Sequence, residues 1–160
     1  MRIRALWPLA AIVLAPAALS AGIVERAEAI EYRVNGKLES RVERDDAGHV
    51  TWLMLAGMSL SHDEVVEIGG LEHLKSIVLY QTNIKDADLK ELKRCGELAH
   101  LNLTDTEITD AAIDTILELK SLKTVCLGNV KVTPEAVARL KQANHSRTHQ
   151  LRYGYFERKR

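Results

Sequence analysis

Apolar residues recur with a period of 24 positions between Val50 and Ala143. The first apolar position of each period holds Val50, Leu74, Leu98 and Leu122. Six more positions are apolar in all four copies, beginning at Leu53, Leu55, Leu60, Val65, Ile68 and Leu71. Agreement at this many positions is very improbable by chance. Residues 50–143 are therefore predicted to be four copies of one structural unit.

Each unit is predicted to contain one strand and one short helix. Its first half alternates apolar and other residues, which is typical of a strand with one buried face. Its second half spaces apolar residues three or four apart, as at Leu89 and Leu92, which predicts a helix with one buried stripe. One unit cannot bury this stripe alone, so stacked units are expected to form a parallel sheet with helices on its other side, an α/β fold.

Helix starts are predicted in the same frame of each unit. Ser61 and Glu64 fit a capping box, and Thr109-Asp110 and Thr133-Pro134 fit N-cap positions. Lys85 breaks this pattern in the second unit, where Asp86 is expected to cap instead.

Both ends of the stack are predicted to carry caps. The N-terminal cap, residues 21–49, is expected to be a helix followed by a hairpin, with Asn35-Gly36 as a turn and residues 45–48 as a second turn. The helix would hold Ile23, Ala27, Ile30 and Val34, and the strand Leu38, Ser40 and Val42. The C-terminal cap, residues 144–160, is expected to contain a strand between Ser146 and Tyr155, with Leu151 24 positions after Leu127.

The units resemble leucine-rich repeats. Residues 79–89 read Leu-Tyr-Gln-Thr-Asn-Ile-Lys-Asp-Ala-Asp-Leu, and residues 103–113 read Leu-Thr-Asp-Thr-Glu-Ile-Thr-Asp-Ala-Ala-Ile. They are similar to the L-x-x-T-x-I-T-D-A-x-L units of exported bacterial leucine-rich-repeat proteins, a subtype similar to F-box-associated repeats. Thr82 and Thr106 match the threonine of this pattern, whereas Met58 and Val130 depart from it.

This resemblance implies a solenoid, a short right-handed horseshoe arc with a concave sheet and convex helices. It implies binding to a protein partner and no catalytic residues. No F-box sequence stands before the repeats, so a ubiquitin-ligase role is not implied.

Residues 1–20 are predicted to be a signal peptide. Arg2 and Arg4 precede an apolar stretch, and Ala18-Leu19-Ser20 places small residues where a signal peptidase reads, so cleavage is expected after Ser20. The alternative is an uncleaved anchor, and only in that case is membrane contact expected. Both alternatives export the remainder of the chain.

Charge gives no general reason to expect nucleic-acid binding, because 22 acidic residues balance 22 basic ones. The basic tail, residues 147–160, is interpreted as a solvated end, with an anionic surface as its alternative partner. The protein partner is expected on strand residues that point away from the core. The candidates are Trp52, Met54, Tyr80, Gln81, His100, Asn102, Thr104 and Thr124.

No catalytic, metal-binding or cofactor-binding residues are predicted. His62-Asp63-Glu64 contains the H-x-E of zinc deaminases without the P-C-x-x-C half. His145 and His149 have a metal spacing on a helix, but a terminal strand would separate them. Cys95 and Cys126 fall at different levels of the stack, so two free thiols are expected.

The function predicted is a non-enzymatic interaction module of the cell envelope or secreted space. Two alternatives remain: a structural subunit of an envelope assembly, and a thiol-dependent enzyme using Cys126 and His100.

Overall fold

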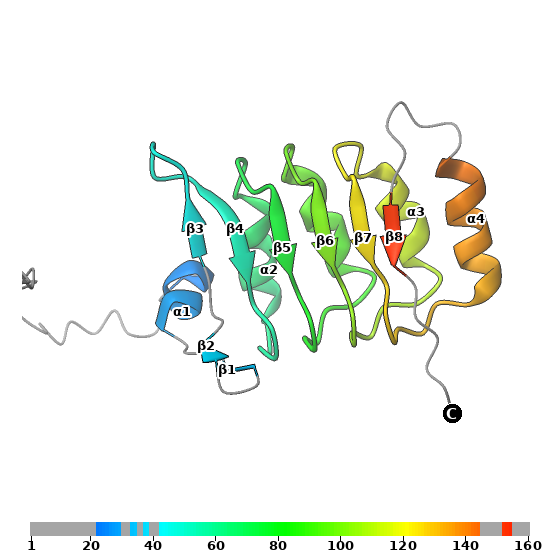
Figure 1. Cartoon of the computed structure of the whole chain (residues 1–160), viewed down its shortest axis with the longest axis horizontal. Coiled ribbons are helices and arrows are strands. Elements are labelled where there is room, and N and C mark those ends of the chain that lie inside the picture. The colour runs from blue at the N-terminus through cyan, green and yellow to red at the C-terminus, as the bar shows by residue number, and fades with distance from the viewer. Residues whose placement is uncertain (1–21, 30–32, 35–36, 39–41, 145–151, 155–160) are drawn as a thin grey trace, which may run out of the picture.

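The computed structural model describes residues 22–29, 33–34, 37–38, 42–144 and 152–154 (Figure 1). The predicted signal peptide lies outside these residues. The described chain is an α/β structure with a six-stranded sheet. Its strands are β3 (Val42–Arg44), β4 (Val50–Met54), β5 (Ser76–Val78), β6 (His100–Asn102), β7 (Thr124–Cys126) and β8 (Arg152–Gly154), and this chain order is also their order in the sheet.

Strands β4 to β8 are parallel, whereas β3 pairs with β4 in the antiparallel sense. From β4 to β7 the register joins residues 24 positions apart: Trp52 pairs with Ser76, Ser76 with His100, and His100 with Thr124. The period read from the sequence is thus the strand register of the sheet, and the predicted parallel sheet is confirmed.

Four helical segments follow the strands β4 to β7 in turn. They are α2 (His62–Gly69), the 3-10 helix η1 (Asp88–Arg94), α3 (Ala112–Glu118) and α4 (Pro134–Asn144). Figure 1 shows α2 and α3 behind the strands, and each helix packs on the next along the stack. One sheet face is therefore covered by helices, and the opposite face, called the open face below, is not.

The core lies between the sheet and these helices. All residues of the seven predicted apolar rows are buried except Leu71 and Ala143, which are partly exposed. Burial of an aliphatic side chain stabilises the fold by about 1.5–3 kcal/mol before chain entropy is subtracted. Thr82 and Thr106 are buried as well, and their hydroxyls donate to the carbonyls of Leu79 and Leu103 at the strand ends.

Helix starts follow the sequence prediction in two units and differ in the other two. Ser61 and Glu64 form the predicted capping box, and the Thr133 hydroxyl accepts from the Ala136 N–H at the start of α4. In the third unit α3 begins only at Ala112, and the Thr109 hydroxyl accepts from Ala111 before the helix.

The prediction that Asp86 caps the second helix is wrong. Asp88 accepts from the Lys85 N–H instead, at 2.9 Å, as Glu64 accepts from the Ser61 N–H in the first unit. Asp86 instead bonds to the next unit, because its two carboxylate oxygens accept hydrogen bonds from the N–H and the hydroxyl of Thr109.

The N-terminal end differs from the predicted helix and hairpin. Helix α1 (Ile23–Ala29) is present, and Ile23 and Ala27 are buried. Val34, however, lies in β1 (Arg33–Val34), which pairs with β2 (Lys37–Leu38), so it is not a helix residue. The single strand predicted through Leu38 and Val42 is split, because Leu38 pairs within this small sheet and Val42 pairs with β4.

The predicted second turn is present. The Asp45 carboxylate accepts from the N–H groups of Ala47 and His49, and Gly48 adopts a φ of +87°, which favours glycine.

A C-terminal strand closes the sheet as predicted, but in a different register. Thr124 pairs with Arg152, and Val125 with Tyr153, so β8 follows β7 after 28 residues rather than 24. Helix α4 has 11 residues, whereas α2 has 8 and α3 has 7. The longer helix accounts for part of this change in spacing. The prediction that Leu151 takes the place of Leu127 in a further unit is therefore wrong. Leu151, His145 and His149 lie outside the described residues.

Candidate functional site

The open face carries two rows of side chains across β4 to β7. The strand register aligns Trp52, Ser76, His100 and Thr124 in one row and Met54, Val78, Asn102 and Cys126 in the other. His100 and Cys126 are exposed, and the other six are partly buried. The alternating residues Leu53, Ile77, Leu101 and Val125 are buried on the helix side. Sequence periodicity therefore assigned these side chains to the correct face.

Neither row contains Asp, Glu, Lys or Arg, although such residues make up 28% of the chain. The first charged residues in register stand at the sheet margins, where Glu43 of β3 pairs with Trp52 and Arg152 of β8 pairs with Thr124. Depletion of charge together with Trp, Tyr and Met is typical of the centre of a protein interface.

Hydrogen bonds fix two polar side chains of this face. The Nδ1 atom of His100 lies 2.6 Å from the Thr124 hydroxyl on the neighbouring strand. The Oδ1 atom of Asn102 accepts a hydrogen bond from the Thr104 N–H at 3.0 Å, and this bond holds the orientation of the Asn102 side chain. These contacts hold the two side chains in one orientation, which reduces the side-chain entropy that is left to lose at this face.

The remaining predicted residues lie where the strands end. Tyr80 and Thr104 are partly buried, and Gln81 is exposed. The Gly57 N–H donates to the Tyr80 carbonyl, and the Gln81 N–H donates to the Thr104 carbonyl. These bonds continue the hydrogen-bonded ladder of the sheet past the strand ends. The predicted residues thus form a central part on the strands and a margin on the turns.

The backbone of this margin has a conformation that was not predicted from the sequence. Gly57, Gln81, Asp105 and Asn129 each follow a strand, and their φ angles are +72°, +55°, +57° and +53°. Asn129 donates to the Asp105 carboxylate, and a hollow of about 600 Å³ is lined by Gln81, Asp105 and Asn129 among others. The 24-residue spacing of these positions was visible, and Gly57, Asp105 and Asn129 are residue types that favour positive φ, whereas Gln81 gives no such signal.

A second hollow lies at the other end of the strands, beside the turn between β3 and β4. It measures about 400 Å³ and is lined by His49 and His73, whose ring centroids are 4.1 Å apart. Their Nδ1 atoms lie 3.1 Å from Asp45 and 3.4 Å from Glu97. Hydrogen bonds from the His49 backbone, partly offset by desolvation, lower the pKa of Asp45.

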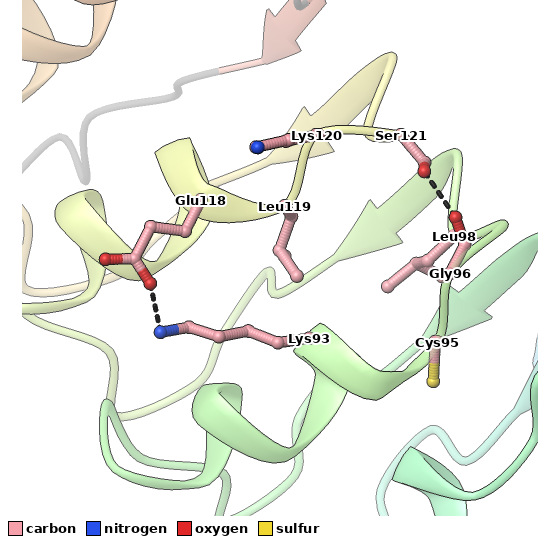
Figure 2. Close-up of a pocket in the computed structure, with 8 residues that line it drawn as sticks. All are labelled: Lys93, Cys95, Gly96, Leu98, Glu118, Leu119, Lys120 and Ser121. Carbon is pink, nitrogen blue, oxygen red and sulfur yellow. Dashed lines mark hydrogen bonds and ion pairs between the residues drawn. The ribbon is translucent and has the colours of Figure 1, made fainter.

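The hollow in Figure 2 lies between the C-terminal ends of η1 and α3 and contains one thiol. It measures about 190 Å³, and Figure 2 shows Lys93 directed toward Glu118 and Ser121 directed toward the Gly96 carbonyl. Cys95 is buried at its edge and donates to the Ile68 carbonyl. Burial raises the pKa of the Cys95 thiol to about 11, so this group is a poor nucleophile near neutral pH.

The other sequence candidates for chemistry are scattered. Both cysteines are free as predicted, Cys95 buried and Cys126 exposed. His62 is the first residue of α2 and is exposed, with its Nδ1 atom 3.9 Å from Asp88. Within the described ranges, no group of three or more His, Cys, Asp and Glu residues is placed to hold a metal ion. No helix among the described residues is long and apolar enough to span a bilayer.

Comparison with known proteins assigns no family: no protein-family model matches the chain, and no curated protein matches it.

Proposed function

We propose that residues 50–143 form a leucine-rich-repeat solenoid whose open face binds a protein partner without catalysing a reaction. The 24-residue strand register and the helices on one side of the sheet support this architecture. The observation that carries the function is the uncharged open face, with Trp52 and Met54 at one side and Tyr80 at its margin. Partly exposed aromatic residues of this kind are frequent anchors of binding energy.

The charged side chains on the helix side support the same assignment of faces. Several of these side chains form ion pairs between neighbouring units: Lys93 pairs with Glu118, and a guanidinium nitrogen of Arg139 lies 2.6 Å from a carboxylate oxygen of Asp114. These groups compensate one another across the stack and remain in water. The helix side therefore behaves as an ordinary solvated surface, and the open face is the better candidate for a partner.

We place this module outside the cytoplasm, because the first twenty residues have the pattern of a signal peptide. N-terminal sequencing of the protein from its native cells tests this assignment. A mature chain beginning at Ala21 supports export by cleavage, whereas a chain retaining residues 1–20 in the cytoplasmic fraction contradicts it.

Photo-crosslinking in the native cells tests the binding face. A benzophenone amino acid replaces Ser76 at the centre of the open face, and in a matched control it replaces Lys90, which is exposed on η1. We expect a specific adduct with a second protein from the Ser76 position and none from Lys90. Adducts from Lys90 alone, or equal adducts from both positions, would contradict the assignment.

A further inference from the structure

The uncharged band on the open face changes in character from one end to the other. Over β4 and β5 it offers the apolar groups of Trp52, Met54 and Val78. Over β6 and β7 it offers the hydrogen-bonding groups of His100, Asn102 and Thr124. A complementary ligand therefore needs an apolar end and a neutral polar end.

The size of the band indicates how large this ligand is. Neighbouring strands lie about 4.8 Å apart, so β4 to β7 extend about 14 Å across the sheet. Strands β5 to β7 have three residues each, which gives a width of about 10 Å. The resulting area, about 140 Å², is a small part of the roughly 800 Å² that each partner contributes to a standard interface between folded proteins. The band fits a short segment better than the flat surface of a second domain.

Charge complementarity defines the chemistry of that segment. A charged side chain placed over the band would lose its hydration without gaining an opposite charge from an Asp, Glu, Lys or Arg within the two rows. The charged residues nearest to the band lie at its edges: Glu43 pairs with Trp52 across the sheet, and the exposed Lys75 and Lys123 stand directly before Ser76 and Thr124. The middle of the bound segment must therefore be uncharged.

Building on the proposed function, we propose that the open face binds a short uncharged peptide segment of its partner. A large apolar side chain of the segment packs against Trp52, Met54 and Val78. Neutral polar groups of the segment form hydrogen bonds near His100, Asn102 and Thr124. Charged residues are excluded from the five or so positions that cross β4 to β7.

A phage-displayed library of random twelve-residue peptides, selected on the full chain, tests this specificity. We expect enriched peptides to share a central uncharged run with one aromatic or large aliphatic residue. The best peptide is then synthesised, and its affinity is measured by fluorescence anisotropy. Enrichment of acidic or basic central runs would overturn the proposal. Failure to enrich any peptide, or Trp52-dependent binding of neutral oligosaccharides in its place, would also overturn it.

Asn102→Asp is the most direct variant, because it adds a charge at the centre of the band with almost no change in shape. The acceptor that receives the Thr104 N–H is kept, so the local hydrogen bond survives. We expect peptide affinity to fall by about tenfold or more. The control is Gln142→Glu, the same amide-to-acid change at an exposed position of α4, which should leave affinity unchanged. Equal affinity of wild type and Asn102→Asp would refute the proposal.

These outcomes separate the two levels of the argument. If Ser76 crosslinks to a partner protein but the selected peptides are charged, the binding face stands and the uncharged-segment inference fails. If Lys90 alone crosslinks, the proposed binding face itself fails.

Discussion

The carboxylate of Asp86 is predicted to join two neighbouring units more strongly than its equivalent one unit later. Asp86 accepts from the Thr109 N–H at 2.8 Å and from the Thr109 hydroxyl at 2.6 Å. Asp110 makes the same two bonds to Thr133, at 2.7 and 2.8 Å. The first pair is partly buried and the second is exposed, so the chain contains a natural comparison of one motif in two environments.

Two double-mutant cycles isolate the hydroxyl–carboxylate bond in each place. Asp86→Ala with Thr109→Val forms one cycle, and Asp110→Ala with Thr133→Val forms the other. A hydrogen bond to a charged group contributes about 1.5–3 kcal/mol when water is excluded, whereas exposed charged pairs contribute about 0.2–1 kcal/mol. With partial burial, we expect a coupling free energy of about 1–2 kcal/mol for the first cycle and about 0.5 kcal/mol or less for the second.

Urea unfolding followed by circular dichroism supplies the free energies, provided that the slope with urea stays constant among variants. Thr133→Val also removes the acceptor of the Ala136 N–H at the start of α4, but the cycle subtracts this single-variant cost. Equal coupling in both cycles, or larger coupling in the exposed pair, would refute the argument that burial sets the strength of these contacts.

Three further predictions concern single groups. At pH 8 iodoacetamide should modify Cys126 rapidly and leave Cys95 unmodified in the folded protein, because Cys95 is buried and its thiol has a pKa of about 11. Mass spectrometry of the alkylated protein measures the labelling of each cysteine, and equal labelling would contradict this prediction. Desolvation raises the pKa of Glu64, but hydrogen bonds from Ser61 and the positive charge of Arg26 outweigh this effect and lower the pKa below 4.5. The contribution of Glu64 to stability is therefore present above pH 4.5 and is lost as the pH falls below that value. The stability difference between wild type and Glu64→Gln should therefore shrink in urea titrations at falling pH, and a difference that grows would contradict this sign. Gln81→Gly relieves a φ of +55° and should change the free energy of unfolding by between zero and about +1 kcal/mol, whereas a loss of stability would show that the Gln81 side chain makes a needed contact.

The strands and the core could be predicted from sequence because a residue's face depends on spacing alone. Leu101 and Leu103 point to one side and Asn102 to the other wherever the strand begins. The same periodicity failed at β8, because the segment that joins β7 to β8, which includes the longer helix α4, makes the spacing 28 residues. The prediction for Asp86 also failed, because the sequence shows a residue type that can cap a helix but not which N–H group it accepts from. Asp88 accepts from Lys85, whereas Asp86 accepts from Thr109 in the next unit.

The two sides of the sheet use their polar residues in different ways, and this difference is the strongest physical reason to look for a partner on the open face. On the helix side and in the loops, charged groups have partners in neighbouring units: Lys93 forms an ion pair with Glu118, and Asp86 accepts hydrogen bonds from Thr109. On the open face the central strands carry no carboxylate, ammonium or guanidinium, yet Trp52 and Met54 are only partly buried. Exposed apolar surface without charge lowers solubility and gives the isolated chain no stability. A surface of this composition becomes favourable when a partner covers it, whereas the helix side is already satisfied in water.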